Sequence, residues 1–134
     1  ALLMIGILRR DLTALWPEQA KKININAVKV SQQLRQISMQ LDDVLFDKNI
    51  AQLVIAKPEL ADFAASLALP IVTLTQAQEN GLKTLYIRKM KTNNTNKKTL
   101  LGKNIKVWEI DDFSKVNTLN FIERWLRSAK NLND

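Results

Sequence analysis

The stretch AQLVIAKPELADFAASLALPIVTLT, residues 51–75, contains two apolar runs separated by a helical pattern. The first run, 51–56, has β-branched residues at its centre, which is typical of a strand buried on both faces. Pro58 suits the first turn of a helix, and Pro70 ends that helix before a second apolar run at 71–75. Strand, helix and strand in this order predict a βαβ unit with parallel strands. Its expected core residues are Leu53, Val54, Ile55, Phe63, Leu67, Ile71 and Leu74.

The segments before this unit are predicted to be helix, strand and helix. Apolar residues recur at near-helical spacing from Leu2 to Leu15, and Trp16-Pro17 ends that pattern, which favours a helix packed on the core. Residues 25–31, INAVKVS, are β-branched and short, and predict a strand. Ser31 can cap a second helix. One apolar stripe follows, formed by Leu34, Ile37, Leu41, Val44 and Leu45.

The segments after the unit predict a helical turn, two strands and a last helix. Gly81 can close the turn QAQENG in a left-handed conformation. Residues 84–90 and 105–110 have strand character, and their polar connection favours an antiparallel hairpin. An amphipathic helix is expected from about residue 115 to 131. We therefore predict one α/β domain over 1–134, with a mixed sheet of four to five strands, one parallel βαβ unit, a C-terminal antiparallel hairpin and flanking helices.

Composition excludes several classes of enzyme. The 134 residues contain neither cysteine nor histidine, so thiolate metal sites, cysteine nucleophiles and histidine acid–base chemistry are absent. The three glycines form no phosphate-binding loop. Asp42-Asp43 and Asp111-Asp112 are adjacent pairs whose side chains diverge, and we expect no catalytic residue, metal or cofactor. A metal-dependent nuclease is the less favoured alternative, with Glu109, Asp111 and Lys115 converging near the Asp47 turn.

The net charge of +7 is unevenly distributed along the sequence. Residues 81–106 contain eight basic residues and no acid, whereas the rest of the chain carries 12 basic and 13 acidic residues. Such a concentration indicates a polyanionic partner, first nucleic acid and second an anionic membrane surface. Lys57, beside the predicted helix start at Pro58, is a weaker candidate for binding an anion. Codon bias in an A/T-rich genome is an alternative source of lysine and asparagine in a solvated loop.

The basic residues predict a non-enzymatic module that binds nucleic acid through a basic β-hairpin and loop, with little sequence specificity. Residues 91–104 are expected to form a mobile basic loop between the two hairpin strands. Lysine and arginine in this region would contact the phosphate backbone. The predicted contact residues are Arg88, Lys89, Lys91, Lys97, Lys98, Lys103 and Lys106.

A second hypothesis is a small accessory subunit of a larger protein assembly. The apolar segment Leu2–Leu8 or the pair Leu100-Leu101 would then dock on a protein partner. The run Leu2–Leu8 is far shorter than the roughly 20 residues that span a bilayer, so no membrane span is expected. The absence of cysteine fits a reducing, cytoplasmic location.

Overall fold

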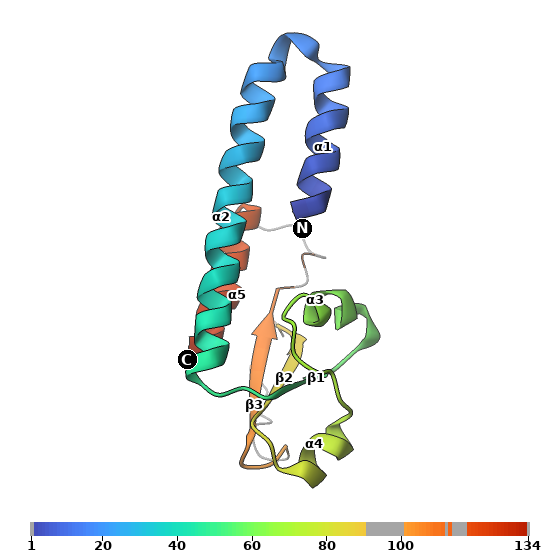
Figure 1. Ribbon diagram of the computed structural model, residues 1–134, viewed down its shortest axis with the longest axis vertical. Helices are drawn as coiled ribbons and strands as arrows, with labels where there is room; N and C mark the ends of the chain where they lie inside the picture. Colours follow the sequence, from blue (N-terminus) through green and yellow to red (C-terminus); the bar gives the residue numbers. More distant parts are fainter. Residues whose placement is uncertain (1, 91–100, 112, 114–117, 134) are drawn as a thin grey trace. The chain divides into compact units, whose positions relative to one another are not determined.

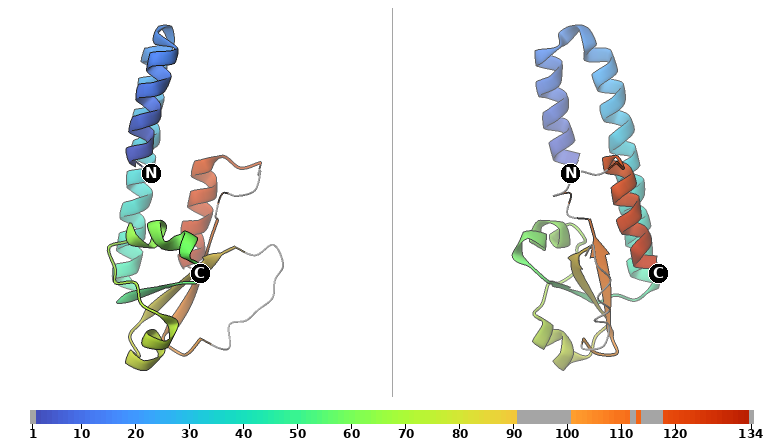
Figure 2. Two further views of the ribbon diagram at one scale, coloured as in Figure 1. Left: turned by 90° about the vertical axis from the view of Figure 1, so that its right-hand side faces the viewer. Right: turned by 180° about the vertical axis from the view of Figure 1, so that it is seen from behind.

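The computed structural model describes residues 2–90, 101–111, 113 and 118–133. The chain forms two compact units, Ala1–Gln40 and Leu41–Asp134 (Figures 1 and 2). In the described residues, helices combine with a three-stranded parallel sheet, which confirms the α/β class and corrects the predicted mixed sheet of four to five strands. That the whole chain forms one domain stays a prediction.

The first unit is a helical hairpin. Helix α1 (Leu2–Leu15) runs antiparallel beside the first part of α2 (Ala20–Asp47), and the short helix η1 (Pro17–Gln19) forms the turn (Figure 1). Pro17 stands at the first position of η1, and the Trp16 N–H donates to the Leu12 carbonyl at 2.9 Å. The predicted end of α1 at Trp16-Pro17 is therefore confirmed.

The predicted strand at 25–31 is wrong, because α2 is helical without interruption from Ala20 to Asp47. Local β-branched content favoured a strand, but the intrinsic helical cost of such residues is only about 0.5 kcal/mol each. A longer apolar pattern alternates steps of four and three residues along α2, and consists of Ile23, Ala27, Val30 and Leu34. These residues form the half-buried to buried side of the helix. That stripe continues through Ile37, Leu41, Val44 and Leu45, as the sequence predicted.

The second unit is built on a parallel sheet in the order β1-β2-β3. The strands are β1 (Gln52–Ile55), β2 (Thr84–Lys89) and β3 (Ile105–Ile110). The helices are η2 (Pro58–Leu60), α3 (Ala61–Ala65), α4 (Leu74–Asn80) and α5 (Phe121–Asn133). Leu53, Leu85, Ile87 and Trp108 are fully buried between the sheet and its helices, and form the centre of this unit's core.

The predicted second strand of the βαβ unit, 71–75, is reduced to one bridge. Ile71 pairs in parallel with Leu53, whose N–H donates to the Pro70 carbonyl and whose carbonyl accepts from the Val72 N–H. Thr73 then starts α4 through a capping box with Gln76. The motif T-x-x-Q, an N-terminal helix signal in the sequence, therefore takes the chain out of the sheet. Gly81 ends α4 in the left-handed conformation, with φ of 65°, as predicted.

The predicted antiparallel hairpin is wrong, because β2 and β3 are parallel and Arg88 lies opposite Glu109. A polar connection with few helix-forming residues favours a hairpin, but its polarity does not prevent a crossover. Residues 90–104 can span about 50 Å when extended, whereas a six-residue strand is about 20 Å long. A crossover between parallel strands therefore needs no helix here.

Candidate interaction surfaces

The parallel register separates the predicted nucleic-acid contacts along the sheet. Arg88 and Lys89 lie at the carboxyl end of β2, whereas Lys103 precedes β3 and Lys106 is the second residue of that strand, at its amino end. An antiparallel hairpin would have brought these two pairs to the same end. The other predicted contacts, Lys91, Lys97 and Lys98, lie outside the described residues.

Three of the four described contacts have an intramolecular partner. The Arg88 guanidinium binds Glu109 Oε1 through Nε at 2.8 Å, with the two side chains 22% and 32% exposed. Lys89 Nζ lies 2.7 Å from Glu59 Oε1, and Lys106 Nζ donates to the Leu132 carbonyl at 2.8 Å. Lys103 is exposed. Formal charge along the sequence therefore overstates the charge that the described part of this region offers to a polyanion.

Lys57, the candidate for binding an anion, lies at the carboxyl end of β1 beside a carboxylate. Glu59 follows it in η2, and the hydrogen bond and charge of Lys89 hold the pKa of Glu59 below its usual value, with a smaller contribution from Lys57. A bound anion would therefore have to compete with Glu59 for both lysines.

The candidate nuclease carboxylates have structural partners. The Arg124 guanidinium forms two hydrogen bonds to Asp111, and the Phe113 N–H donates to Asp111 Oδ1 at 2.8 Å. Glu109 binds Arg88. In the described ranges no three acidic side chains come together as a metal site, and Lys115 lies outside those ranges. Glu109 and Asp111 therefore have structural roles in the fold.

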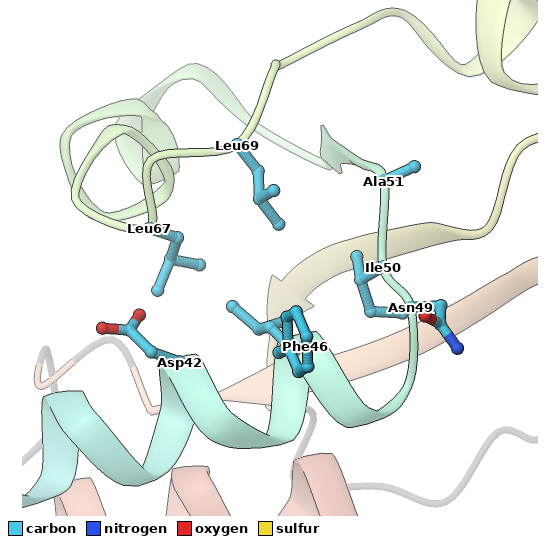
Figure 3. Close-up of a pocket in the computed structure, with 8 residues that line it drawn as sticks. Asp42, Phe46, Asn49, Ile50, Ala51, Leu67 and Leu69 are labelled. Carbon is cyan, nitrogen blue, oxygen red and sulfur yellow. The ribbon is translucent and has the colours of Figure 1, made fainter.

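An open groove of about 390 Å³ lies between the end of α2 and the segment after α3 (Figure 3). Leu67 and Leu69 approach it from one side and Phe46 and Ile50 from the other, with the Asp42 carboxylate at its rim. The Phe46 side chain is 82% exposed. The groove can accept an apolar group, and its lining contains no pair of groups suited to acid–base chemistry.

Helix α1 carries a larger apolar surface than the groove. All 14 of its residues are described, and none is buried. Apart from Leu2, its large exposed apolar side chains follow each other at steps of three and four residues, so they form one continuous strip along about 21 Å of helix. This strip, termed the α1 face, consists of Leu3, Met4, Ile7, Leu8, Leu12 and Leu15.

The α1 face extends the docking segment proposed from the sequence, Leu2–Leu8, by two more turns. The same spacing predicts a helix packed on the core, whereas the structure leaves this side of α1 exposed. In the second docking candidate, Leu101 is half-buried, whereas Leu100 lies outside the described residues. Among the described residues, no helix combines the length and the hydropathy needed to cross a membrane.

No protein-family model matches this chain, and a search of curated proteins finds no significant match.

Proposed function

We propose that the protein is a non-enzymatic interaction subunit that docks on a partner protein through the α1 face. The observation that carries the proposal is the exposure of this face, with Leu3 at 80% and Leu15 at 67%. Proteins that act alone rarely expose a contiguous apolar strip, and such strips mark interaction sites. A helix that is apolar around most of its circumference is normally covered.

The proposal is supported by what lies on the two sides of α1. The side with some cover carries Ile5 and Thr13, both half-buried, while the leucines occupy the exposed side. A hairpin that served only to stabilise itself would place its leucines in the seam between the two helices. This arrangement instead leaves the larger apolar area exposed, which supports docking of another molecule.

The test is affinity capture with the full chain and two matched variants. Leu8→Gln with Leu15→Gln removes two apolar side chains from the α1 face without adding charge, and Phe46→Gln removes an even more exposed apolar side chain elsewhere. We expect the parent and the Phe46 variant to capture the same protein, and the double variant to lose it. The captured protein is identified by mass spectrometry and rebound in purified form.

Circular dichroism and thermal unfolding accompany the capture. The double variant should keep the helical content and the unfolding temperature of the parent, because exposed side chains contribute little to stability. Loss of folding would make these leucines structural and defeat the proposal. Equal capture by all three chains would exclude the α1 face as the docking surface.

Binding to a nucleic-acid backbone is the second candidate. It is favoured by the exposed Lys103 and by the absence of acids between Lys91 and Lys103. Because Arg88, Lys89 and Lys106 have intramolecular partners, the expected phosphate contacts are reduced to Lys91, Lys97, Lys98 and Lys103. Charge without an aromatic platform favours binding with little base preference.

A salt titration with labelled duplex and single-stranded nucleic acid tests this candidate. Each phosphate contact contributes roughly 0.9 to the slope of log affinity against log salt for duplex DNA. Lys97→Ala with Lys98→Ala should therefore flatten the slope by up to about 2, whereas Lys21→Ala with Lys22→Ala should leave it unchanged. No binding at low salt, or equal slopes for parent and variant, would dismiss the candidate.

A further inference from the structure

The α1 face needs an occupant that also matches its electrostatic surroundings. Residues 1–40 contain six basic and two acidic residues, a net charge of +4. The basic residues Arg9, Arg10, Lys21, Lys22, Lys29 and Arg35 are all exposed. This second basic region does not appear in the net charge of the chain, because the excess of acidic residues in the segment 41–80 cancels its positive charge. The net charge therefore reflects mainly residues 81–106. Arg9 lies three residues from Leu12 and Arg10 three residues from Ile7, so an occupant of the α1 face meets positive charge along its border.

A second copy of the chain does not match this border. Two hairpins packed face to face would bring two net charges of +4 together, and like charges across an interface oppose association. The exposed acids on the hairpin are Asp11 and Glu18, and Asp11 already binds Arg10 Nε at 2.9 Å. Few carboxylates are therefore left to pair with the basic residues of another copy.

An anionic lipid surface would match the positive charge of the hairpin, but it does not suit the α1 face. Asp11 is a neighbour of Ile7, Leu8 and Leu15 on the helix surface, three or four residues away from each. In contact with acyl chains, its carboxylate would lose water without gaining a new hydrogen-bond donor. A protein can place a donor opposite Asp11 and apolar side chains around it.

The hairpin alone has too few helices to enclose an apolar seam. Two helices leave at least one face of each open, and helical bundles close this gap with further helices. The Thr13 hydroxyl of α1 is enclosed and has no hydrogen-bond partner within the described chain. The seam between α1 and α2 is therefore not an optimised core, which fits a hairpin completed by another helix.

We infer that the occupant of the α1 face is an amphipathic helix of a partner protein, with an apolar seam and acidic flanks. This inference rests on the proposed function and adds the chemical class of the partner. The apolar seam covers the leucines of α1, and the acidic flanks meet the basic residues on both helices of the hairpin. Helix-in-groove recognition has this form, with apolar anchors at helical spacing and charges at the border.

The experiment titrates the full chain with two synthetic helical peptides of about three heptads. Both carry leucine at positions a and d, with glutamate at e and g in one peptide and lysine in the other. Like charges at e and g also keep each peptide from pairing with itself. We expect saturable binding of the acidic peptide and no binding of the basic peptide, measured by fluorescence anisotropy.

The variants separate the apolar from the electrostatic contribution. Leu8→Gln with Leu15→Gln should weaken binding of the acidic peptide at least tenfold. Lys21→Gln with Lys22→Gln should weaken it less and reduce its dependence on salt, and Phe46→Gln should change neither. Because both lysines are exposed and lie beyond the end of α1, the lysine variant is expected to fold like the parent.

Other occupants would give different results. Equal binding of both peptides, or of neither, overturns the inference. Binding to phosphatidylserine vesicles that is lost in the leucine variant assigns the face to lipid. A dimer in sedimentation velocity that is lost in the same variant assigns it to a second copy. A purified partner that needs Leu8 and Leu15 but does not compete with the acidic peptide overturns the inference and leaves the proposed function standing.

Discussion

Phe63 shows how single residues join the elements of the second unit. Its ring centroid lies 5.4 Å from that of Trp108 on β3 and 5.1 Å from that of Trp125 on α5. The nearly perpendicular ring planes of Phe63 and Trp125, at 74°, are the edge-to-face arrangement that aromatic quadrupoles favour. Phe63 therefore links α3 to both other elements, although its side chain is only half-buried.

Phe63→Ala should lower the free energy of unfolding by about 3 kcal/mol, at the lower end for this truncation because of the partial exposure. Chemical denaturation measures the change. Phe46→Ala, at an 82% exposed site, is the control and should change stability by less than about 1 kcal/mol. A similar small change for Phe63 would mean that α3 does not pack on the two tryptophans.

Arg124 and Asp111 form an ion pair with little exposure, at 11% and 14% of their side chains. Arg124 also lies over the Phe113 ring, 4.7 Å from its centroid. Removing one member of such a pair leaves the other charge poorly solvated, which costs about 3 to 5 kcal/mol when the pair is fully buried.

Arg124→Gln should therefore destabilise the protein by about 3 kcal/mol in the same denaturation assay. The Arg10–Asp11 pair provides a matched contrast, because its side chains are 74% and 52% exposed. Arg10→Gln should cost less than about 1 kcal/mol, since water already solvates both groups. Equal effects of the two substitutions would contradict a structural role for the Arg124–Asp111 pair.

At the scale of elements, α5 shows how a cap selects a helix boundary. The sequence predicted a helix from about residue 115, but α5 begins at Phe121. Asn120 and Glu123 form a capping box, in which each side chain accepts a hydrogen bond from the other residue's N–H at 3.0 and 2.8 Å. The N-x-x-E motif was present in the sequence and marks the start of α5, whereas residues 115–117 of the predicted helix lie outside the described residues.

Asn120→Ala should lower stability by about 1 kcal/mol and leave the rest of α5 folded. Asn120→Asp is the control, because aspartate accepts the same hydrogen bond and adds a charge that the helix dipole favours. Denaturation curves and far-ultraviolet circular dichroism measure both variants. A loss with the aspartate variant equal to that with alanine would indicate that the cap does not set the start of α5.

At the scale of the whole molecule, the two units differ in how much core they contain. The sheet residues Leu53, Leu85, Ile87 and Trp108 are fully buried, whereas α1 contributes no buried residue. Local opening is easiest where few apolar contacts hold the backbone. The hairpin should therefore open more readily than the sheet.

Native-state hydrogen exchange tests this expectation. Amides of β1, β2 and β3 should exchange slowest, at rates set by global unfolding, and amides of α1 should exchange much faster. The acidic peptide provides a further comparison, since a bound helix should slow exchange in α1 and leave the sheet unchanged. Equal protection of α1 and β2 in the free protein would show that hairpin and sheet unfold together.

Several features followed from the sequence alone because their causes are local. The apolar run at β1, the stripe from Leu34 to Leu45, the left-handed Gly81 and the end of α1 at Trp16-Pro17 each depend on neighbouring residues. The absence of cysteine and histidine excluded whole classes of chemistry without a structure. The exposed apolar spacing of α1 was also present in the sequence, but spacing does not say whether an apolar face is covered.

Tertiary structure decided the features that depend on contacts between residues far apart in the sequence. The same apolar pattern serves a parallel or an antiparallel neighbour, and the connection between β2 and β3 is long enough for either, so the direction of β3 depends on packing. That direction in turn placed Arg88 opposite Glu109 and separated it from Lys103. Counting charges along the chain could not foresee this, because the strength of a charged group depends on its nearest partners in space. The sequence therefore gives the number of basic residues, whereas the fold determines how many of them already have an intramolecular partner.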